Sequence, residues 1–168
     1  MHDVIAQALG IVAVVLGFFC FQMRTQKSLL IVQTATVGVF CVHYLMIGAT
    51  SGMVLNLIGI ARNLAYYRAD RNPLFRRWAP VCFAVIMGVG GLLSWQGPVS
   101  AFMVSGVVIH TLCLSFTDPQ RIRKGVLISS PLFLIYNALM FSIGGMVYES
   151  AAIISSIIGI IRYKERKT

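Results

Sequence analysis

Polar side chains that could bind a solute or carry a proton stand singly within long runs of apolar residues. They are Gln33, Thr34, Thr36, His43, Asn56, Asn63, His110, Ser129, Ser130, Asn137, Glu149, Ser155 and Ser156. Among apolar residues, amides, hydroxyls and imidazoles either contact a polar ligand or hold neighbouring helices together. For the Ser and Thr residues we favour helix contacts, and for Asn56 both interpretations stay open.

The sequence lacks the patterns that an enzyme or a metal centre would need. There is no H-E-x-x-H motif, no pair of carboxylates within one apolar run and no Ser or Cys beside a base. His43 and His110 have no second metal ligand at helical spacing. The four cysteines lie singly in apolar runs, at Cys20, Cys41, Cys82 and Cys113. We therefore expect no catalytic residue, no metal ion and no cofactor.

The apolar runs dominate the composition of the chain. Of 168 residues, 58% are hydrophobic and 11% are charged, whereas soluble domains average roughly 25% charged residues. The mean hydropathy is +0.83. The runs cover residues 4–22, 29–47, 50–67, 78–95, 99–116, 125–143 and 147–162. Because each run is long enough to cross a bilayer, they predict an all-α integral membrane protein with seven transmembrane helices in a single domain, residues 1–168.

The basic residues predict how these helices are oriented. The fourteen Lys and Arg residues lie near the ends of, or after, the first, third, fifth and seventh runs. With seven crossings these places share one side of the membrane, which the positive-inside rule assigns to the cytoplasm. We therefore expect the N-terminus outside and the C-terminus in the cytoplasm. The net charge of +9 then reflects contact with lipid headgroups, not with nucleic acid.

Two parts of the chain resemble each other. The segment "NLIGIARNLAYYR" (56–68) matches "SIIGIIRYKER" (156–166), and the connector "CFQMRTQKS" (20–28) matches "TDPQRIRKG" (117–125). The first match pairs Asn56 with Ser156, Gly59 with Gly159 and Arg62 with Arg162. We therefore predict two parallel three-helix repeats, residues 1–71 and 98–168, joined by a linker helix within 72–97. A solute site is expected at mid-depth between such repeats.

Longer segments carry a resemblance to a known family. "RTQKSLLIVQ" (24–33), "VHYLMIGATSGMVLNLIGIARNLAYYR" (42–68) and "SSPLFLIYNALMFSIGGMVYESAAIISSIIGIIR" (129–162) resemble the bacterial inner-membrane YgjV family over nearly the full chain. This resemblance implies a multi-pass protein of the bacterial inner membrane. More distantly, the three-plus-one-plus-three plan and "DPQRIRKG" (118–125) resemble the PQ-loop and SWEET sugar transporters. In those proteins two three-helix bundles alternate access around a central solute.

The distant resemblance implies particular site residues. SWEET proteins place an Asn on the third helix of each bundle against the solute, which implies Asn56, with Ser156 in the second repeat. Their helix prolines act as hinges, which implies Pro131. The Pro-Gln pair is present in the second repeat alone, as Pro119-Gln120. The predicted solute contacts are Asn56, Ser156, Asn63, Asn137, Tyr136 and Gln33. For Tyr136 and Asn137 helix packing is an equal alternative.

Four charged or titratable residues could form gates or anchors. Arg62 and Arg162 lie within two turns of the expected cytoplasmic boundary, so we favour anchors that reach the interface, with a gate or a contact to an anionic solute as the alternative. Glu149 begins the last run, which predicts an exposed interfacial acid. The alternative is a proton relay in which His43 pairs with Glu149.

These residues predict a facilitative transporter. Amides and hydroxyls without carboxylates at mid-depth suit a small, polar, uncharged solute, such as a sugar or a vitamin-like metabolite. The two repeats would rock against each other to expose the solute alternately on either side. The alternative function is a membrane scaffold or sensor that binds a protein or lipid partner and transports nothing. The sequence leaves a homodimer open.

Overall fold

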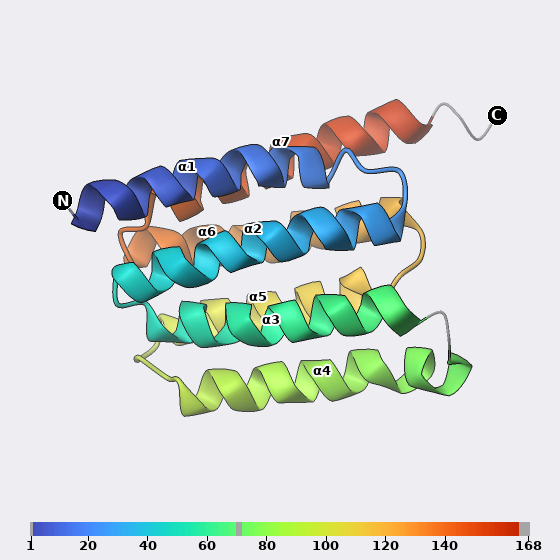
Figure 1. Cartoon of the computed structure of the whole chain (residues 1–168), viewed down its shortest axis with the longest axis horizontal. Coiled ribbons are helices and arrows are strands. Elements are labelled where there is room, and N and C mark those ends of the chain that lie inside the picture. Colours follow the sequence, from blue (N-terminus) through green and yellow to red (C-terminus); the bar gives the residue numbers. More distant parts are fainter. Residues whose placement is uncertain (1, 70–71, 165–168) are drawn as a thin grey trace.

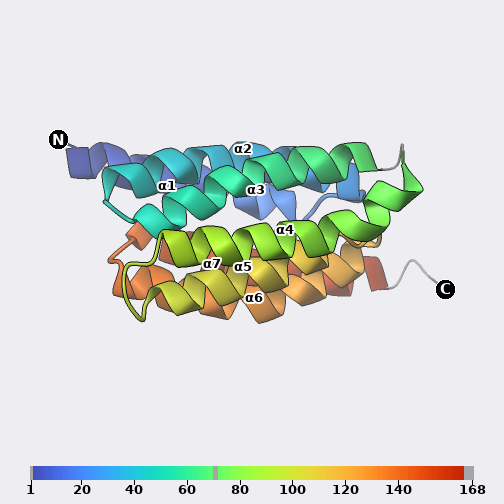
Figure 2. The same cartoon turned by 90° about the horizontal axis from the view of Figure 1, so that it is seen from below.

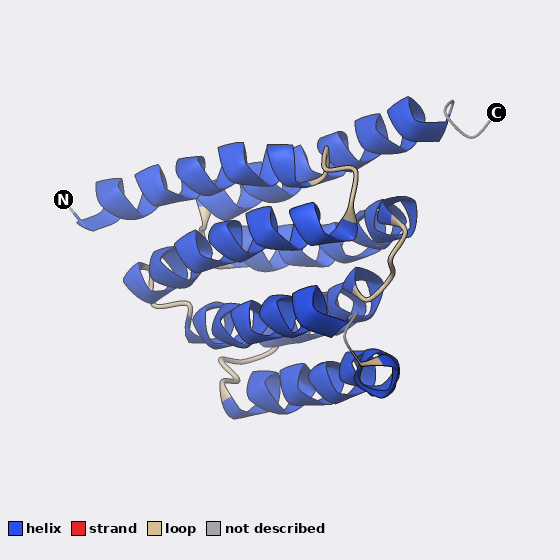
Figure 3. Ribbon diagram, turned by 45° about the vertical axis from the view of Figure 1, so that its right-hand side comes forward, coloured by secondary structure: helices blue, strands red, loops and turns tan. Residues whose placement is uncertain are grey.

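The computed structural model describes residues 2–69 and 72–164, and these residues form helices and short connectors (Figure 3). Within these two described ranges, seven helices follow one another. They are α1 (His2–Cys20), α2 (Gln26–Met46), α3 (Thr50–Arg68), α4 (Pro73–Leu93), α5 (Ser100–Leu114), α6 (Pro119–Leu139) and α7 (Ile143–Lys164). The predicted all-helical fold and the number of helices are therefore confirmed for the described residues.

Two helices begin well before the apolar runs that predicted them. Helix α4 starts at residue 73 and not 78, and helix α6 starts at residue 119 and not 125. The Asn72 side chain accepts hydrogen bonds from the first-turn amides of α4, and the Asp118 side chain does the same for α6. Pro73 and Pro119 follow directly, at a position where proline favours a helix start. Each capped start adds a turn that carries basic residues.

The helices form two layers with one additional helix at an edge. Figure 2 shows α1, α2 and α3 in one layer and α5, α6 and α7 in the other. At one edge α1 packs against α7, and at the other edge α3 packs against α5. Helix α4 contacts both α3 and α5, so it covers the second edge (Figure 1).

The basic connectors gather at one end of the bundle. The connectors after α1, α3 and α5 lie at the same end, where α7 also finishes, and the N-terminus lies at the opposite end (Figure 1). This shared end holds Arg24, Lys27, Arg68, Arg76, Arg77, Arg121 and Lys124. Arg71, Arg166 and Lys167 lie outside the described residues. The positions of the basic connectors thus agree with the predicted alternation of seven helices.

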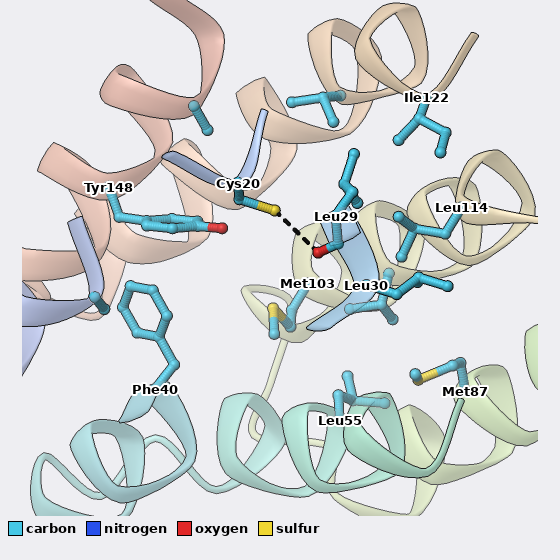
Figure 4. Packing of buried hydrophobic residues seen from close by; sticks show 14 of the residues in the cluster. Cys20, Leu29, Leu30, Phe40, Leu55, Met87, Met103, Leu114, Ile122 and Tyr148 are labelled. Atoms are coloured by element: carbon cyan, nitrogen blue, oxygen red, sulfur yellow. Dashed lines mark hydrogen bonds between the residues drawn. The ribbon is translucent and has the colours of Figure 1, made fainter. Parts of the chain in front are cut away.

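Large apolar side chains cover the outside of the bundle as well as its core. The core includes Leu29, Leu55, Met87, Leu114 and Ile122, which Figure 4 shows packed between helices. Helix α4 buries few residues and exposes a series of large apolar ones, among them Trp78, Val81, Val85, Val89 and Leu92. Such an exposed apolar surface suits contact with lipid.

Among the described residues, three helices are long and apolar enough to cross a membrane, namely α2, α4 and the 143–163 part of α7. The shorter stretches Leu9–Cys20 and Ser100–Leu114 are also apolar. Helices α3 and α6 are more polar because they bury groups such as Arg62, Asn63, Arg123 and Ser129 inside the bundle. Inward-facing polar residues therefore lower the hydropathy of both helices, together with the exposed Arg68, Arg121 and Lys124 at the basic end.

Two glycines allow α1 and α7 to approach closely. A Cβ added to Gly144 would lie 2.5 Å from the Cα of Gly10, and a Cβ added to Gly10 would lie 2.7 Å from the Cα of Gly144. Real side chains do not tolerate these distances, so any larger residue must push the helices apart. The seam between the two layers therefore depends on small residues, as is common between membrane helices.

Replacing Gly144 by Ala is expected to destabilise the protein by roughly 1–3 kcal/mol, because the added methyl group overpacks the seam. Gly38→Ala is the matched control, since a Cβ at Gly38 would meet nothing within 4 Å. The control should be neutral or up to about 1 kcal/mol more stable. Unfolding in detergent, followed by circular dichroism, measures both variants. Equal midpoints for the two variants would show that the seam is not closely packed.

Candidate functional site

A cavity of about 70 Å³ lies between the two layers. Side chains from α2, α3, α5, α6 and α7 line it. Its polar and charged lining residues are Gln33, Tyr44, Asn56, Arg62, His110, Ser130, Tyr148 and Glu149. A buried water needs about 10–15 Å³ of such space. The cavity can therefore hold a few waters or a small polar molecule.

Arg62 lies inside the bundle, against the prediction that it anchors at the interface. Its side chain is 3% exposed. The guanidinium donates to the Thr111 hydroxyl at 2.8 Å and, through Nε and Nη2, to Oδ1 of Asn63 at 3.1 and 2.9 Å. Nη2 also lies 3.7 Å from the position that a Cβ on Gly59 would take. The side chain therefore leans back along α3 and does not reach toward the basic end.

A chain of side-chain hydrogen bonds crosses the layers beside Arg62. The Gln33 amide nitrogen lies 2.6 Å from Nε2 of His110, and Nδ1 of His110 lies 3.1 Å from the Ser129 hydroxyl. Oε1 of Gln33 is buried and has no partner among the described residues. Because Gln33 lines the cavity, this amide oxygen is suited to accept a hydrogen bond from a ligand.

Glu149 also lines the cavity, so the predicted exposed interfacial acid is wrong. The side chain is 7% exposed, and the side chain of Ser130 on α6 lines the same cavity. The reason is that α7 begins at Ile143, before the apolar run that starts at residue 147. Glu149 therefore lies well inside the helix and not at its first turn. Its proposed partner His43 contacts the Ser142 hydroxyl at 2.8 Å.

Two of the six predicted solute contacts line the cavity. Asn56 and Gln33 line the cavity, and Asn56 donates to the carbonyl of Gly52 in its own helix at 2.7 Å. Asn63 is a partner of Arg62 and does not line the cavity. Ser156 is fully buried elsewhere in the bundle, and its hydroxyl has no partner among the described residues.

Tyr136 and Asn137 connect the two layers near the end of the bundle that holds the N-terminus. The Tyr44 hydroxyl donates to Oδ1 of Asn137 at 2.8 Å, and the amide of Gly52 donates to the Tyr136 hydroxyl at 3.1 Å. They therefore form links between the layers.

Pro131 and Arg162 lie outside the cavity, because both are exposed. Their predicted roles, as a hinge and as a gate or anchor, stay predictions.

The sequence did not single out Arg123, which is 1% exposed. It donates to the carbonyls of Phe21 and Met23 at 2.9 and 2.8 Å, which ties α6 to the end of α1. Gly159 on α7 makes room for it, since a Cβ there would lie 2.5 Å from Nε of Arg123. The sequence feature that could have identified Arg123 is the helix start at Asp118-Pro119, because this start places Arg123 inside a helix and not in a loop.

The described residues contain no group of three or more His, Cys, Asp or Glu side chains that could hold a metal ion. The side chains that line the cavity, among them Gln33, Arg62 and Glu149, can recognise a small molecule by charge and hydrogen bonds.

Cysteine labelling can test which residues line the cavity. In a background whose four cysteines are replaced by Ala, Asn56→Cys should react with 2-aminoethyl methanethiosulfonate at least about tenfold faster than Ser156→Cys, because a thiolate forms readily only in contact with water. Mass spectrometry of the intact protein in lipid nanodiscs measures both rates. Similar rates would mean that positions 56 and 156 are equally accessible to water, which would contradict the placement of Asn56 alone in the cavity lining.

Known proteins match the chain over most of its length. The family profile Imp-YgjV, described as bacterial inner membrane protein, matches residues 4–167. The inner membrane protein YgjV of Escherichia coli (strain K12) is 26% identical over 162 residues, which cover 95% of this chain and 84% of that protein. No solved structure matches the chain, and the more distant resemblance to PQ-loop and SWEET transporters gains no support from these matches. Because the profile covers nearly the whole chain, the protein belongs to the Imp-YgjV family of bacterial inner membrane proteins.

Proposed function

We propose that this protein transports a small polar solute, with the cavity between the layers as the solute site. The observation that carries the proposal is the polar cavity itself, which residues from both layers line in the middle of an apolar bundle. Polar and ionisable groups inside a membrane protein are costly and mark solute or ion pathways. In this proposal all seven helices cross the membrane, and the basic end faces the cytoplasm.

The arrangement of the layers supports a mechanism with two moving units. A two-fold axis along the membrane normal would bring α1 onto α5, α2 onto α6 and α3 onto α7. The same axis would place the α1–α7 contact at one edge onto the α5–α3 contact at the other edge. Both contacts are observed. Parallel repeats of this kind with a site between them are a transporter architecture. Helix α4 is then the linker of a SWEET-like arrangement.

Hydrogen bonds between the layers at both ends of the cavity would act as gates. Near the N-terminal end, His43 contacts Ser142, and Tyr44 donates to Asn137. At the basic end, Gln22 donates to the hydroxyl of Ser155 at 2.9 Å, and Arg123 donates to the carbonyls near the end of α1. Alternating access requires one set of contacts to open while the other stays closed.

The charged lining changes the expected solute. The prediction of an uncharged solute depended on a cavity without charged groups, but Arg62 and Glu149 both line it. We therefore propose a polar solute and no longer require it to be neutral. The volume of the cavity, about 70 Å³, limits the solute to a few non-hydrogen atoms in this conformation. A hexose would need a wider opening.

Reversible locks at the two ends can test alternating access. Two double variants, Gln22→Cys/Ser155→Cys at the basic end and His43→Cys/Ser142→Cys at the other, are cross-linked with a short bifunctional thiol reagent in a background without native cysteines. Each lock should reduce uptake of a radiolabelled solute into proteoliposomes more than about tenfold, because both ends must open in turn. Reductive removal of the cross-link should restore uptake.

The corresponding single-cysteine variants, treated with the same reagent, control for labelling alone. The uptake screen uses amino acids, sugars and vitamin precursors. If none of these solutes enters proteoliposomes faster than empty liposomes, the transport proposal fails and a sensor or scaffold becomes the better account. Uptake that persists with both ends locked would also contradict alternating access.

A further inference from the structure

The cavity contains two side chains of opposite charge that no hydrogen bond joins. Among the described residues, Arg62 donates hydrogen bonds to Thr111 and Asn63, and Glu149 lines the cavity together with Ser130. None of these three neighbours carries a charge. Buried charges are strongly unfavourable unless a countercharge or several hydrogen bonds compensate them. Each of these two groups is therefore suited to a ligand group of the opposite charge.

The part of the cavity around Glu149 is built to accept a cation. Phe40, Tyr44 and Tyr148 line the cavity beside it. The Phe40 ring lies 4.7 Å from Tyr148 in an edge-to-face arrangement and 5.6 Å from Tyr44 in a stacked one, measured between ring centroids. Figure 4 shows the rings of Phe40 and Tyr148 lying close to each other. Aromatic faces together with a carboxylate are the usual surroundings of a bound ammonium group.

The part around Arg62 is built to accept an anion. The hydrogen bonds of Arg62 use Nε–H, one N–H of Nη1 and one of Nη2, which leaves two of the five N–H groups of a guanidinium. The planar arrangement of these donors matches a carboxylate. Gln33 and His110 line the same part of the cavity and are hydrogen-bonded to each other. They can contact the ligand beside its anionic group.

The two parts lie at different depths along the bundle. Helices α3 and α7 start at the same end, and Arg62 lies six residues further from its helix start than Glu149, which is about 9 Å along the axis. The Arg62 side chain leans back toward Gly59 and shortens this separation. The remaining space suits a compact molecule that carries both charges.

We propose that the cavity binds a small zwitterion, with its carboxylate on Arg62 and its ammonium group near Glu149 and the aromatic rings. This inference rests on the proposed function, because it names the class of solute for the same site. A zwitterion is favoured over a simple anion or cation because it compensates both buried charges and leaves the cavity electrically neutral. The volume of about 70 Å³ matches a ligand the size of the smallest amino acids.

Binding to the full-length protein in lipid nanodiscs tests the proposal. The zwitterionic probes are glycine, L-alanine and glycine betaine, and the probes that carry one charge are propionate and ethylammonium. Calorimetric titration and thermal unfolding measure binding, since a ligand that binds the folded state raises the unfolding midpoint. We expect at least one zwitterion to bind at least about tenfold more tightly than either single-charge probe.

Alanine and glycine betaine differ in their ammonium groups, because only the group of alanine carries N–H donors. If alanine binds more tightly than glycine betaine, the ammonium group donates hydrogen bonds to Glu149. Tighter binding of glycine betaine would assign the aromatic rings as the main contact. Either order supports a zwitterion site.

Variants identify the residues involved. Arg62→Gln and Glu149→Gln should each weaken binding of the zwitterion at least about tenfold. Glu149→Gln should also reduce the ratio between the dissociation constants of propionate and alanine. Arg162→Gln is the matched control, because Arg162 occupies the equivalent position in the second repeat and is exposed. It should leave binding unchanged. If Arg62→Gln does not fold, Arg62→Lys and Glu149→Gln still test the two ends of the site.

Three results would overturn the proposal. In the first, no zwitterion changes the unfolding midpoint. In the second, propionate binds as tightly as alanine and Glu149→Gln has no effect, which indicates a site for simple anions. In the third, glycerol competes with alanine, which indicates a site for neutral solutes. Zwitterion binding without uptake into proteoliposomes would support this inference while the transport proposal fails, so the two outcomes can be told apart.

Discussion

An arginine and a glutamate line one cavity inside the bundle, and this constraint determines much of the structure. Each charge needs polar neighbours, because an uncompensated ion in such surroundings is strongly unfavourable. Thr111 and Asn63 supply them for Arg62 through hydrogen bonds, and Ser130 lines the cavity together with Glu149. The polar residues of α3 and α6 therefore face inward, while the outer surface stays apolar enough for lipid.

The two three-helix segments that resemble each other in sequence differ in where their arginines lie. Arg62 and Arg162 occupy equivalent sequence positions, but the first lines the cavity and the second is exposed. In the second repeat a different arginine, Arg123, is the buried one, and it holds the end of α1 against α6. The buried arginine therefore lies on the third helix of one segment, at Arg62 of α3, and on the second helix of the other, at Arg123 of α6.

The sequence predicted the features that depend on local pattern and charge counting. Apolar runs predicted seven helices, and the basic connectors predicted which helix ends lie together. Of the candidate site residues, Asn56 and Gln33 line the cavity, and their contact with a solute stays a prediction. The burial of Arg62 and Glu149 was not predicted, because the direction in which a side chain points depends on which helix packs beside it. Caps that extend helices beyond their apolar runs, such as Asp118, also moved residues from expected loops to the interior.

A double-mutant cycle between Arg62 and Glu149 tests the shared cavity most directly. The free energy of unfolding is measured for Arg62→Gln, Glu149→Gln and the double variant in nanodiscs without added solute. If the two charges share one polar cavity, removing one leaves the other uncompensated, so the double variant should be more stable than the sum of the single effects by about 1 kcal/mol or more. If the effects of the two substitutions on the free energy of unfolding add within about 0.3–0.5 kcal/mol, the two charges do not interact. This result would contradict a cavity shared by Arg62 and Glu149.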